Sequence, residues 1–463
     1  MNSRPRDSDG ETAERTAARH VLFPAQDMEH FDAPDRALLT RGEGIYVYDS
    51  RGRRLIDGPA GMWCTQVGYG RREIADALAD QALTLSYNSP WYTVNNPAAE
   101  LAARIAEVTP GDLNHVFFTT GGSTAVDSAL RFTEFYNNML GRPDKKVILC
   151  RMEGYHGSTH LTAACSGRAG NWPYFDVSTE RVSFLSAPNI RLSPGASEAE
   201  FLESLVSEFE QRVAQLGPHR VAAFLAEPLL ASGGVLIPPR HYHRRIKALC
   251  EQHDILYISD EVVTAFGRCG YWFASQDVFD FMPDIITFAK GVTSGYVPLG
   301  GFAISERILA RVTGPRAKGA FFTNGYTYSG HPVSCAAALA NMALIEREGL
   351  LLHVRTLSPY FQRQLGTLRE LPNVADVRGI GLVGCVECGV DAQVPGSPEL
   401  NQAIARRVDR YCFDLGLIVR PIGSMCVLSP PLIITERQID DAVSILREAL
   451  VRAHQDWQRG DIR

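Results

Sequence analysis

Two short apolar stretches of the sequence each end in a residue able to do acid–base or nucleophilic chemistry. Ile255–Ser259 leads into Asp260, and Ile285–Ala289 leads into Lys290. Because open α/β sheets bind ligands at the carboxyl ends of their strands, both side chains are expected at one site. A lysine there is partly desolvated, which lowers its pKa and leaves a neutral amine able to form a Schiff base. Taken alone, Asp260 could instead begin a turn, and Lys290 could be a solvated or paired cation.

A third segment predicts an anion site. The apolar stretch His115–Thr119 is followed by Thr120-Gly121-Gly122-Ser123-Thr124 and then by a helical pattern over Ala125–Leu140. Free backbone N–H groups and the positive end of a helix dipole favour a phosphate at such a helix start. The same residues also fit an ordinary capped helix after a tight turn. The motif G-x-x-x-x-G-K is absent, so the segment is not a nucleotide P-loop.

Together these groups match the requirements of pyridoxal phosphate. The cofactor needs a phosphate anchor, an aspartate that keeps its pyridine nitrogen protonated, and a lysine amine for the Schiff base. Tyr155 is a further candidate, since it lies in the loop Gly154–Ser158 just after the apolar stretch Val147–Arg151. A tyrosine at this sheet edge can lie flat on an aromatic cofactor, although it could also be an ordinary turn residue.

Two other motifs are set aside. Gly379–Gly384 matches G-x-G-x-x-G, but it runs into a strand rather than a helix and opens no βαβ unit, so we expect no dinucleotide site there. Cys385 and Cys388 form a C-x-x-C without a second pair, within a stretch that is typical of a strand. We therefore interpret them as two strand cysteines and expect no metal.

The positions of these residues depend on an alternation of strands and helices. The expected strands are His115–Thr119, Val147–Arg151, Val182–Leu185, Val221–Ala226, Ile255–Ser259 and Ile285–Ala289, and the helices between them include Ser197–Gln215 and His241–Gln252. Such alternation predicts an α/β fold in which a mostly parallel sheet is covered by helices on both faces. From Pro332 onward a long helix, Cys335–Arg347, precedes short strands, which indicates a smaller α+β domain.

The N-terminal region has its own signals. Arg41–Asp57 is typical of a β-hairpin, and Arg72–Leu85 and Pro97–Val108 carry helical spacing, the second helix opened by Asn96 as a cap. We divide the chain into a disordered tail (1–19), an N-terminal segment that joins the small domain (20–75), a large cofactor-binding domain (76–331) and a C-terminal small domain (332–463).

Composition limits the classes of protein. The 463 residues carry a net charge of −6, so no positive field would attract nucleic acid or an anionic membrane. No run of 18 apolar residues occurs, so no membrane span is expected. The ten cysteines are scattered through apolar stretches rather than spaced as a disulfide framework, which favours a reducing cytoplasm.

Several motifs in one order resemble a known family. They are the segments Thr120–Leu130, Gly154–Ser158, Ala226–Pro228, Ser259–Arg268, Ala289–Gly291 and Tyr326–Pro332. From about His20 onward the chain resembles the class-III aminotransferases, which belong to the fold-type-I pyridoxal phosphate enzymes. Gly61-Met62-Trp63-Cys64 and Gly416-Leu417-Ile418-Val419-Arg420 are most similar to patterns of the amine:pyruvate, or ω-, transaminases.

The resemblance implies residue roles. Lys290 would form the Schiff base, Asp260 would pair with the pyridine nitrogen, and Tyr155 would stack on the ring; these would be the catalytic residues. The other cofactor-binding residues that it implies are Gly122, Ser123, His156, Glu227, Val262 and Thr327. Since the family takes the threonine at position 327 from the neighbouring subunit, a homodimer with two shared sites is implied.

Three residues would bind substrate. Trp63 and Trp91 would line the pocket, and Arg420 would bind the carboxylate of a keto acid. Two positions depart from related patterns, with Thr124 where many relatives have Glu and Val263 where ornithine- and γ-aminobutyrate-type members carry Gln. The second departure points away from those subfamilies.

The resemblance therefore implies ping-pong transamination from an amine or ω-amino acid donor to a keto acid, with pyruvate as the expected acceptor. Another pyridoxal phosphate reaction on the same fold remains an alternative, such as that of an aminomutase, a decarboxylase or a phospho-lyase. A non-catalytic protein that binds the cofactor is a further alternative. The sequence does not rank the amine donors.

Overall fold

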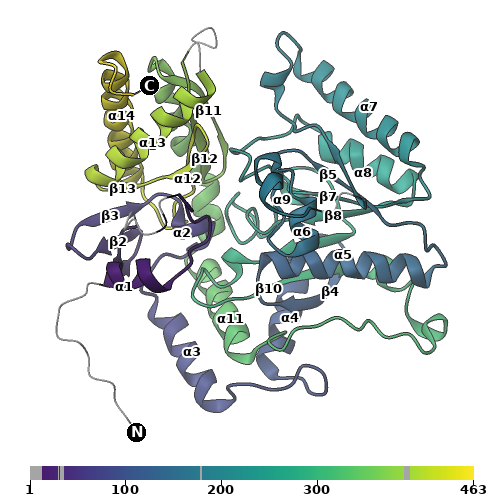
Figure 1. The fold of residues 1–463 in the computed structure, drawn as a ribbon. Coiled ribbons are helices and arrows are strands. Elements are labelled where there is room, and N and C mark those ends of the chain that lie inside the picture. Colours follow the sequence, from purple (N-terminus) through teal and green to yellow (C-terminus); the bar gives the residue numbers. More distant parts are fainter. Residues whose placement is uncertain (1–12, 30, 32–35, 178–179, 391–396, 463) are drawn as a thin grey trace.

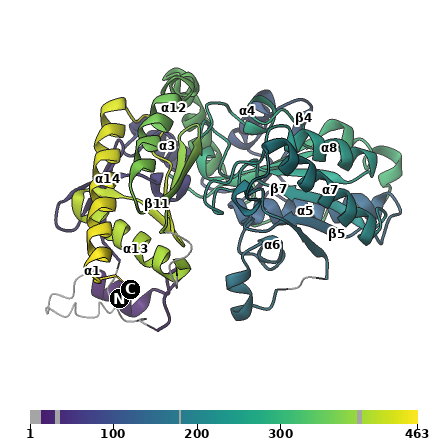
Figure 2. The same ribbon diagram turned by 90° about the horizontal axis from the view of Figure 1, so that it is seen from above.

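The computed structural model describes residues 13–462 except 30, 32–35, 178–179 and 391–396. Figure 1 shows a large lobe, built from the middle of the chain, beside a smaller lobe to which both the N-terminal and the C-terminal segments contribute. The view from above in Figure 2 shows the long helix of the C-terminal segment on the outer side of the smaller lobe.

A sheet of seven strands forms the centre of the large lobe. In spatial order its strands are β4 (Leu113–Thr119), β10 (Gly300–Ser305), β9 (Ile285–Phe288), β8 (Leu256–Asp260), β7 (Val221–Ala226), β5 (Val147–Arg151) and β6 (Val182–Leu185). β10 runs antiparallel to both of its neighbours, and the other neighbouring pairs are parallel. The α/β class and the mostly parallel sheet predicted from the sequence are thus confirmed.

Helices cover both faces of this sheet, as the apolar strands require. α5 (Gly122–Met139) buries its apolar side against one face. α7 (Glu198–Leu216) and α8 (Tyr242–Gln252) pack on the other face. Ser197 caps α7 in a capping box with Glu200, which fixes the start of that helix.

β10 is the strand that the sequence did not predict. It begins with Gly300 and Gly301, and glycine disfavours strands in general. Here both glycines are required by close packing. A Cβ on Gly300 would lie 2.6 Å from the carbonyl oxygen of Gly121, and one on Gly301 would lie 2.6 Å from that of Phe117. The strand therefore rests directly on the loop that opens α5.

The smaller lobe contains a second, antiparallel sheet. Its strands are, in spatial order, β11 (Val374–Ile380), β12 (Val383–Cys388), β15 (Met425–Leu428) and β14 (Arg420–Ile422). The helices of this region are α11 (Pro332–Arg347), α12 (Leu350–Gly366), α13 (Ser397–Leu415) and α14 (Glu436–Gln458). Cys385 and Cys388 both lie on β12, in different apolar clusters, so the C-x-x-C motif is part of a strand as interpreted above.

A third sheet joins the two ends of the chain. β1 (Leu39–Glu43), β2 (Tyr46–Asp49) and β3 (Arg54–Asp57) form antiparallel pairs, and β13 (Leu417–Ile418) pairs with β3 in parallel. The expected hairpin is therefore present with one further strand. This pairing supports our proposal that the N-terminal segment joins the small domain, and the four domain limits given above remain a proposal.

The remaining helices are α1 (Ala13–His20), α2 (Ala60–Trp63), α3 (Arg72–Thr84), α4 (Asn96–Val108), α6 (His160–Cys165), α9 (Ala274–Asp277) and α10 (Glu306–Leu309). Where the sequence predicted a disordered tail, the structure describes helix α1, and residues 1–12 lie outside the described residues. α1 has Glu14 in its first turn and Arg19 in its last, an arrangement that suits the helix dipole. No helix in the described ranges is long and apolar enough to span a membrane.

The cap of α4 differs by one residue from the sequence prediction. Asn95, and not Asn96, is the N-cap: its Oδ1 accepts a hydrogen bond of 2.9 Å from the N–H of Ala98. Its Nδ2 also donates to Oδ1 of Asn88 and to the carbonyl of Gly330, at 2.8 and 2.9 Å. Asn95 is buried, whereas Asn96 is exposed.

We therefore expect Asn95→Ala to lower the free energy of unfolding by about 1–2 kcal/mol, since it removes a cap and leaves a buried carbonyl without its donor. Asn96→Ala is the matched control and should change it by less than about 0.5 kcal/mol. The midpoints of urea unfolding of the two variants test this. Equal effects of the two substitutions would contradict the assignment of the cap.

Candidate active site

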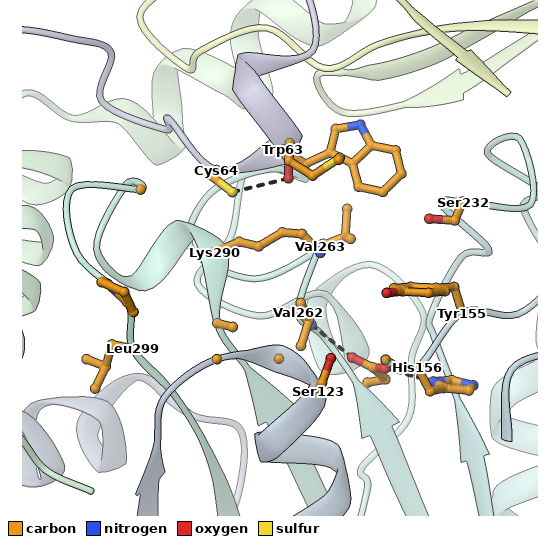
Figure 3. A pocket seen from close by; sticks show the side chains of 18 of the residues that line it. Trp63, Cys64, Ser123, Tyr155, His156, Ser232, Val262, Val263, Lys290 and Leu299 are labelled. Carbon is orange, nitrogen blue, oxygen red and sulfur yellow. Dashed lines mark hydrogen bonds and ion pairs between the residues drawn. The ribbon is translucent and has the colours of Figure 1, made fainter. Parts of the chain in front are cut away.

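A cavity of about 580 Å³ lies at the carboxyl ends of the central strands, between the two lobes. Figure 3 shows that side chains enter it from several separate segments. The start of α5, the loops after β5 and β7, and the ends of β8 and β9 supply one wall. The opposite wall comes from α2 and from Arg420 at the start of β14.

Lys290 projects into this cavity from the turn that follows β9. Its backbone has φ of 42°, a left-handed conformation that is costly for a residue with a side chain and that often occurs at functional sites. Burial lowers the pKa of its amine. Nζ lies 5.6 Å from the centre of the Trp63 ring, and no carboxylate of the described chain pairs with it. The amine is therefore available to react.

Asp260, the last residue of β8, is buried and held from several directions. Its Oδ2 accepts a hydrogen bond of 2.7 Å from Nδ1 of His156. Its Oδ1 accepts bonds of 3.2 Å from the N–H of Val262 and from Oγ1 of Thr287. These donors fix the direction of the carboxylate, as a partner of a ring nitrogen requires.

Glu227 fixes the loop that carries Tyr155. Its Oε1 accepts a hydrogen bond of 3.1 Å from the N–H of Tyr155, and its Oε2 accepts one of 3.1 Å from the N–H of Ala231. Burial raises the pKa of this carboxyl. Oη of Tyr155 lies 2.9 Å from Oγ of Ser158, and Figure 3 shows Tyr155 and Lys290 entering the pocket from opposite sides.

The start of α5 forms the floor of the pocket. Gly122 and Ser123 are the first residues of the helix, and both line the cavity with N–H groups that precede the first helical hydrogen bonds. A Cβ on Gly122 would lie 3.0 Å from Cγ1 of Val262, so glycine keeps this cradle open. Thr124 does not line the pocket, and its Oγ1 donates to the carbonyl of Gly121 at 2.9 Å.

The predicted substrate residues divide into two groups. Trp63 and Arg420 meet in the cavity, with the guanidinium carbon of Arg420 4.6 Å from the centre of the Trp63 ring. Trp91 and Thr327 do not line it. Trp91 is 55% exposed, and the carbonyl of Thr327 accepts a hydrogen bond of 3.1 Å from Oη of Tyr87, so both lie on one exposed surface of the chain.

Several residues of the pocket were not predicted from the sequence. Thr287, one strand away from Asp260, orients its carboxylate, and Arg168 and Ser232 line the cavity beyond Tyr155. The alternation of strands could have suggested Thr287, which precedes Lys290 by three residues on β9. Nothing in the sequence near Arg168 or Ser232 indicates a binding residue, because long connections bring them to the site.

The residues of the pocket fit pyridoxal phosphate. An unpaired buried amine, an oriented buried carboxylate, a tyrosine ring and a glycine-lined helix start face one cavity. When bound, the cofactor supplies an electron sink for carbanion chemistry. In the described part of the chain, no three His, Cys, Asp or Glu side chains are grouped so as to hold a metal ion.

Comparison with known proteins agrees with this fit. Residues 29–450 match the family model described as Aminotransferase class-III. The putrescine–pyruvate aminotransferase of Pseudomonas aeruginosa is 36% identical over 434 residues, 93% of this chain and 94% of that protein. A probable γ-aminobutyrate transaminase 2 (mitochondrial) of Oryza sativa subsp. indica is 37% identical over 418 residues, 89% of this chain and 84% of that protein.

Solved structures give the same result. A thermostable (S)-enantioselective ω-transaminase from Thermomicrobium roseum aligns with a TM-score of 0.89 and 35% identity, covering 95% of this chain and 97% of that one. The fold and the pocket thus define a pyridoxal phosphate-dependent enzyme of fold type I. Within that class, the chain belongs to the class-III aminotransferases.

The state of Lys290 leads to a prediction about cofactor incorporation. Only the neutral amine attacks the aldehyde of pyridoxal phosphate, so the rate of incorporation into the apoprotein should rise with pH through the pKa of Lys290. Because burial lowers that pKa from its ordinary value of 10.5, the midpoint should lie below 10.5. The rate can be followed by the absorbance of the bound cofactor near about 400–430 nm. A midpoint equal to that of Nα-acetyl-lysine, whose side-chain amine is free and solvated, would contradict the burial effect.

Proposed function

We propose that this enzyme moves an amino group from an amine or ω-amino acid to a keto acid, with pyruvate as an acceptor, by a ping-pong mechanism. The observation that carries the proposal is the meeting, in one cavity, of the unpaired amine of Lys290 and the guanidinium of Arg420. The first group does the chemistry at the amine carbon. The second binds the carboxylate that only the acceptor must carry.

Lys290 acts as the base and then as the acid of the reaction. With the cofactor bound, Nζ of Lys290 would take the proton from the substrate carbon that bears the amino group and would later give a proton back, and the cofactor would supply the electron sink for that carbon. Its lowered pKa favours the neutral amine that this step needs. Asp260, oriented by His156, would hold the ring nitrogen of the cofactor, and Tyr155 would pack against its ring.

Arg420 selects the acceptor. A guanidinium binds a carboxylate with two parallel hydrogen bonds, and the ring of Trp63 supports the cation from one side. The name of the Pseudomonas relative, putrescine–pyruvate aminotransferase, pairs a diamine donor with this acceptor and supports the same pairing here. The relatives named γ-aminobutyrate transaminases support an ω-amino acid as another donor, contrary to the expectation drawn above from Val263.

We also propose a homodimer with shared active sites. Trp91 and Thr327, which the family resemblance assigns to the pocket, instead lie with Tyr87 on an exposed aromatic surface of the same chain. That surface also includes the exposed rings of Tyr92 and Tyr328. A second copy that covered this surface would receive Thr327 at its phosphate site and Trp91 at its pocket.

A reducing, cytoplasmic setting completes the proposal. All ten cysteines are free thiols in the structure, and all of them except Cys64 are buried. Such thiols persist where disulfide formation is not favoured.

Replacement of Lys290 tests the chemistry. Lys290→Ala should lower the rate of amino transfer by several orders of magnitude, because it removes both the attachment point and the proton-transfer group. The measurement is alanine formation from pyruvate with a panel of diamines, ω-amino acids and arylalkylamines. One alanine per carbonyl product is expected from the wild type. Carbonyl or other products without alanine would favour an aminomutase, decarboxylase or phospho-lyase, and cofactor binding without turnover would favour a non-catalytic protein.

Mixed dimers test the shared site. Lys290→Ala and Thr327→Asp chains should each be inactive as homodimers, the second because a carboxylate repels the cofactor phosphate. In a mixed dimer, one site receives Lys290 and Thr327 intact from different chains. Co-expression should therefore restore roughly a quarter of wild-type activity, since half of randomly formed dimers are mixed and each has one intact site. No recovery would show that Thr327 acts within its own chain, and an active Thr327→Asp homodimer would show that Thr327 does not act at the phosphate.

A further inference from the structure

The pocket contains a second arginine, Arg168, that the proposed function does not use. It lines the cavity beside Tyr155 and Ser232, on the wall that leads towards Arg420. Its backbone position is fixed by Gly167, whose N–H donates to the carbonyl of Gly154 and whose carbonyl accepts from the N–H of Glu153, both at 3.0 Å. The segment is thus tied to the loop that carries Tyr155.

Gly167 also explains why the segment approaches so closely. It forms a parallel β-bridge with Met152, and a Cβ at this position would lie 2.5 Å from the carbonyl oxygen of Arg151. Only glycine fits this contact. As a result the backbone at Arg168 is held beside the end of β5, and its side chain reaches the carbonyl of Ser232 in the pocket lining.

The guanidinium of Arg168 has N–H donors that make no hydrogen bond to the described residues. Nη2 of Arg168 donates to the carbonyl of Ser232. The buried Nε of Arg168 has no partner among the described residues. Nε of Arg420 is likewise buried and without a partner in that part of the chain. No described carboxylate forms an ion pair with either side chain, so two cations face the cavity without counter-charges.

The two arginines are close enough to influence one another. Burial lowers the pKa of Arg420, and the positive charge of Arg168 lowers it further. Both side chains are half-buried, and two like charges that face one cavity cost free energy unless an anion lies between them. Other half-buried arginines of the chain avoid this cost by pairing, as Arg378 does with Asp376 and Glu387.

The cofactor phosphate does not supply that anion. Its cradle is the start of α5 at Ser123, and Figure 3 shows Tyr155 between Ser123 and Ser232, the residue whose carbonyl holds Arg168. The arginine pair therefore lies on the substrate side of the pocket. Asn171, in the short 3-10 helix Ala169–Tyr174 that follows Arg168, also lines the cavity with an amide side chain.

We propose that Arg168 is a specificity-determining residue that binds the second carboxylate of a 2-oxo dicarboxylate acceptor, while Arg420 binds the other carboxylate. The inference rests on the amino transfer proposed above and adds a dianionic acceptor class to pyruvate. Each guanidinium offers a planar pair of donors that matches a carboxylate. A monocarboxylate leaves one of the two cations without a counter-charge.

The exchange balances without another reactant. The C–N bond of the donor amine becomes a C=O bond, and the C=O bond of the 2-oxo dicarboxylate becomes a C–N bond that carries one new hydrogen on carbon. Water supplies the carbonyl oxygen of the donor product in the first half-reaction, and the carbonyl oxygen of the acceptor leaves as water in the second. The two-electron oxidation of the donor equals the reduction of the acceptor, so the product is an acidic amino acid.

The kinetic test compares two acceptors. We expect Arg168→Met to lower the ratio of kcat/KM for 2-oxoglutarate to kcat/KM for pyruvate by about 10- to 100-fold, as for loss of a charge-assisted hydrogen-bonded pair. Arg168→Lys should restore part of the ratio. Arg220→Met removes the same charge at the opposite, amino-terminal end of β7 and should leave the ratio unchanged. An unchanged ratio in Arg168→Met, or an equal fall in Arg220→Met, would overturn the proposal.

A binding measurement separates this proposal from the proposed function. Calorimetry of the cofactor-loaded enzyme with glutarate and with butyrate, which lacks the second carboxylate, needs no turnover. Glutarate should bind at least about 10-fold more tightly than butyrate, and Arg168→Met should remove most of that preference. Glutarate preference without amino transfer would refute the proposed function but keep the dicarboxylate site. Amino transfer to pyruvate without a preference for glutarate would keep the proposed function but refute the dicarboxylate site.

Discussion

The site depends on keeping the amine of Lys290 free of a carboxylate while two carboxylates face the same cavity. Asp260 avoids the lysine because His156, Val262 and Thr287 occupy its oxygens. Glu227 is held in the same way by two backbone N–H groups. An ion pair would keep the lysine protonated and unreactive, so these hydrogen bonds protect its chemistry as much as they orient their own side chains.

Much of the large lobe could be predicted because its strands are apolar on both faces and end in polar residues. β5, β6 and β7 have the predicted limits, and the same reasoning located Asp260 and Lys290. The strand β10 could not be predicted, since its glycines are required by close contacts with residues that are distant in sequence. Arg168 was missed for a similar reason: a glycine contact brings it to the pocket, and no periodic pattern reports such a contact.

The two walls of the cavity serve different purposes. The cofactor side is built by the ends of neighbouring strands and the start of α5, so the central sheet fixes its geometry directly. The wall that we propose binds substrate draws Trp63, Arg168 and Arg420 from three separate segments. Relatives whose names refer to putrescine and to γ-aminobutyrate share this family, which fits a fold that fixes the reaction and leaves substrate choice to side chains.

The parallel pairing of β13 with β3 has a consequence for the order in which the enzyme is made. All strands of the central sheet have been synthesised once the ribosome has passed Ser305, the end of β10. The sheet of the N-terminal strands, by contrast, needs β13, which begins at Leu417. The contact of Trp63 with Arg420 likewise needs the C-terminal part of the chain. The half of the site that we propose binds the cofactor is therefore synthesised before the half that we propose binds the substrate.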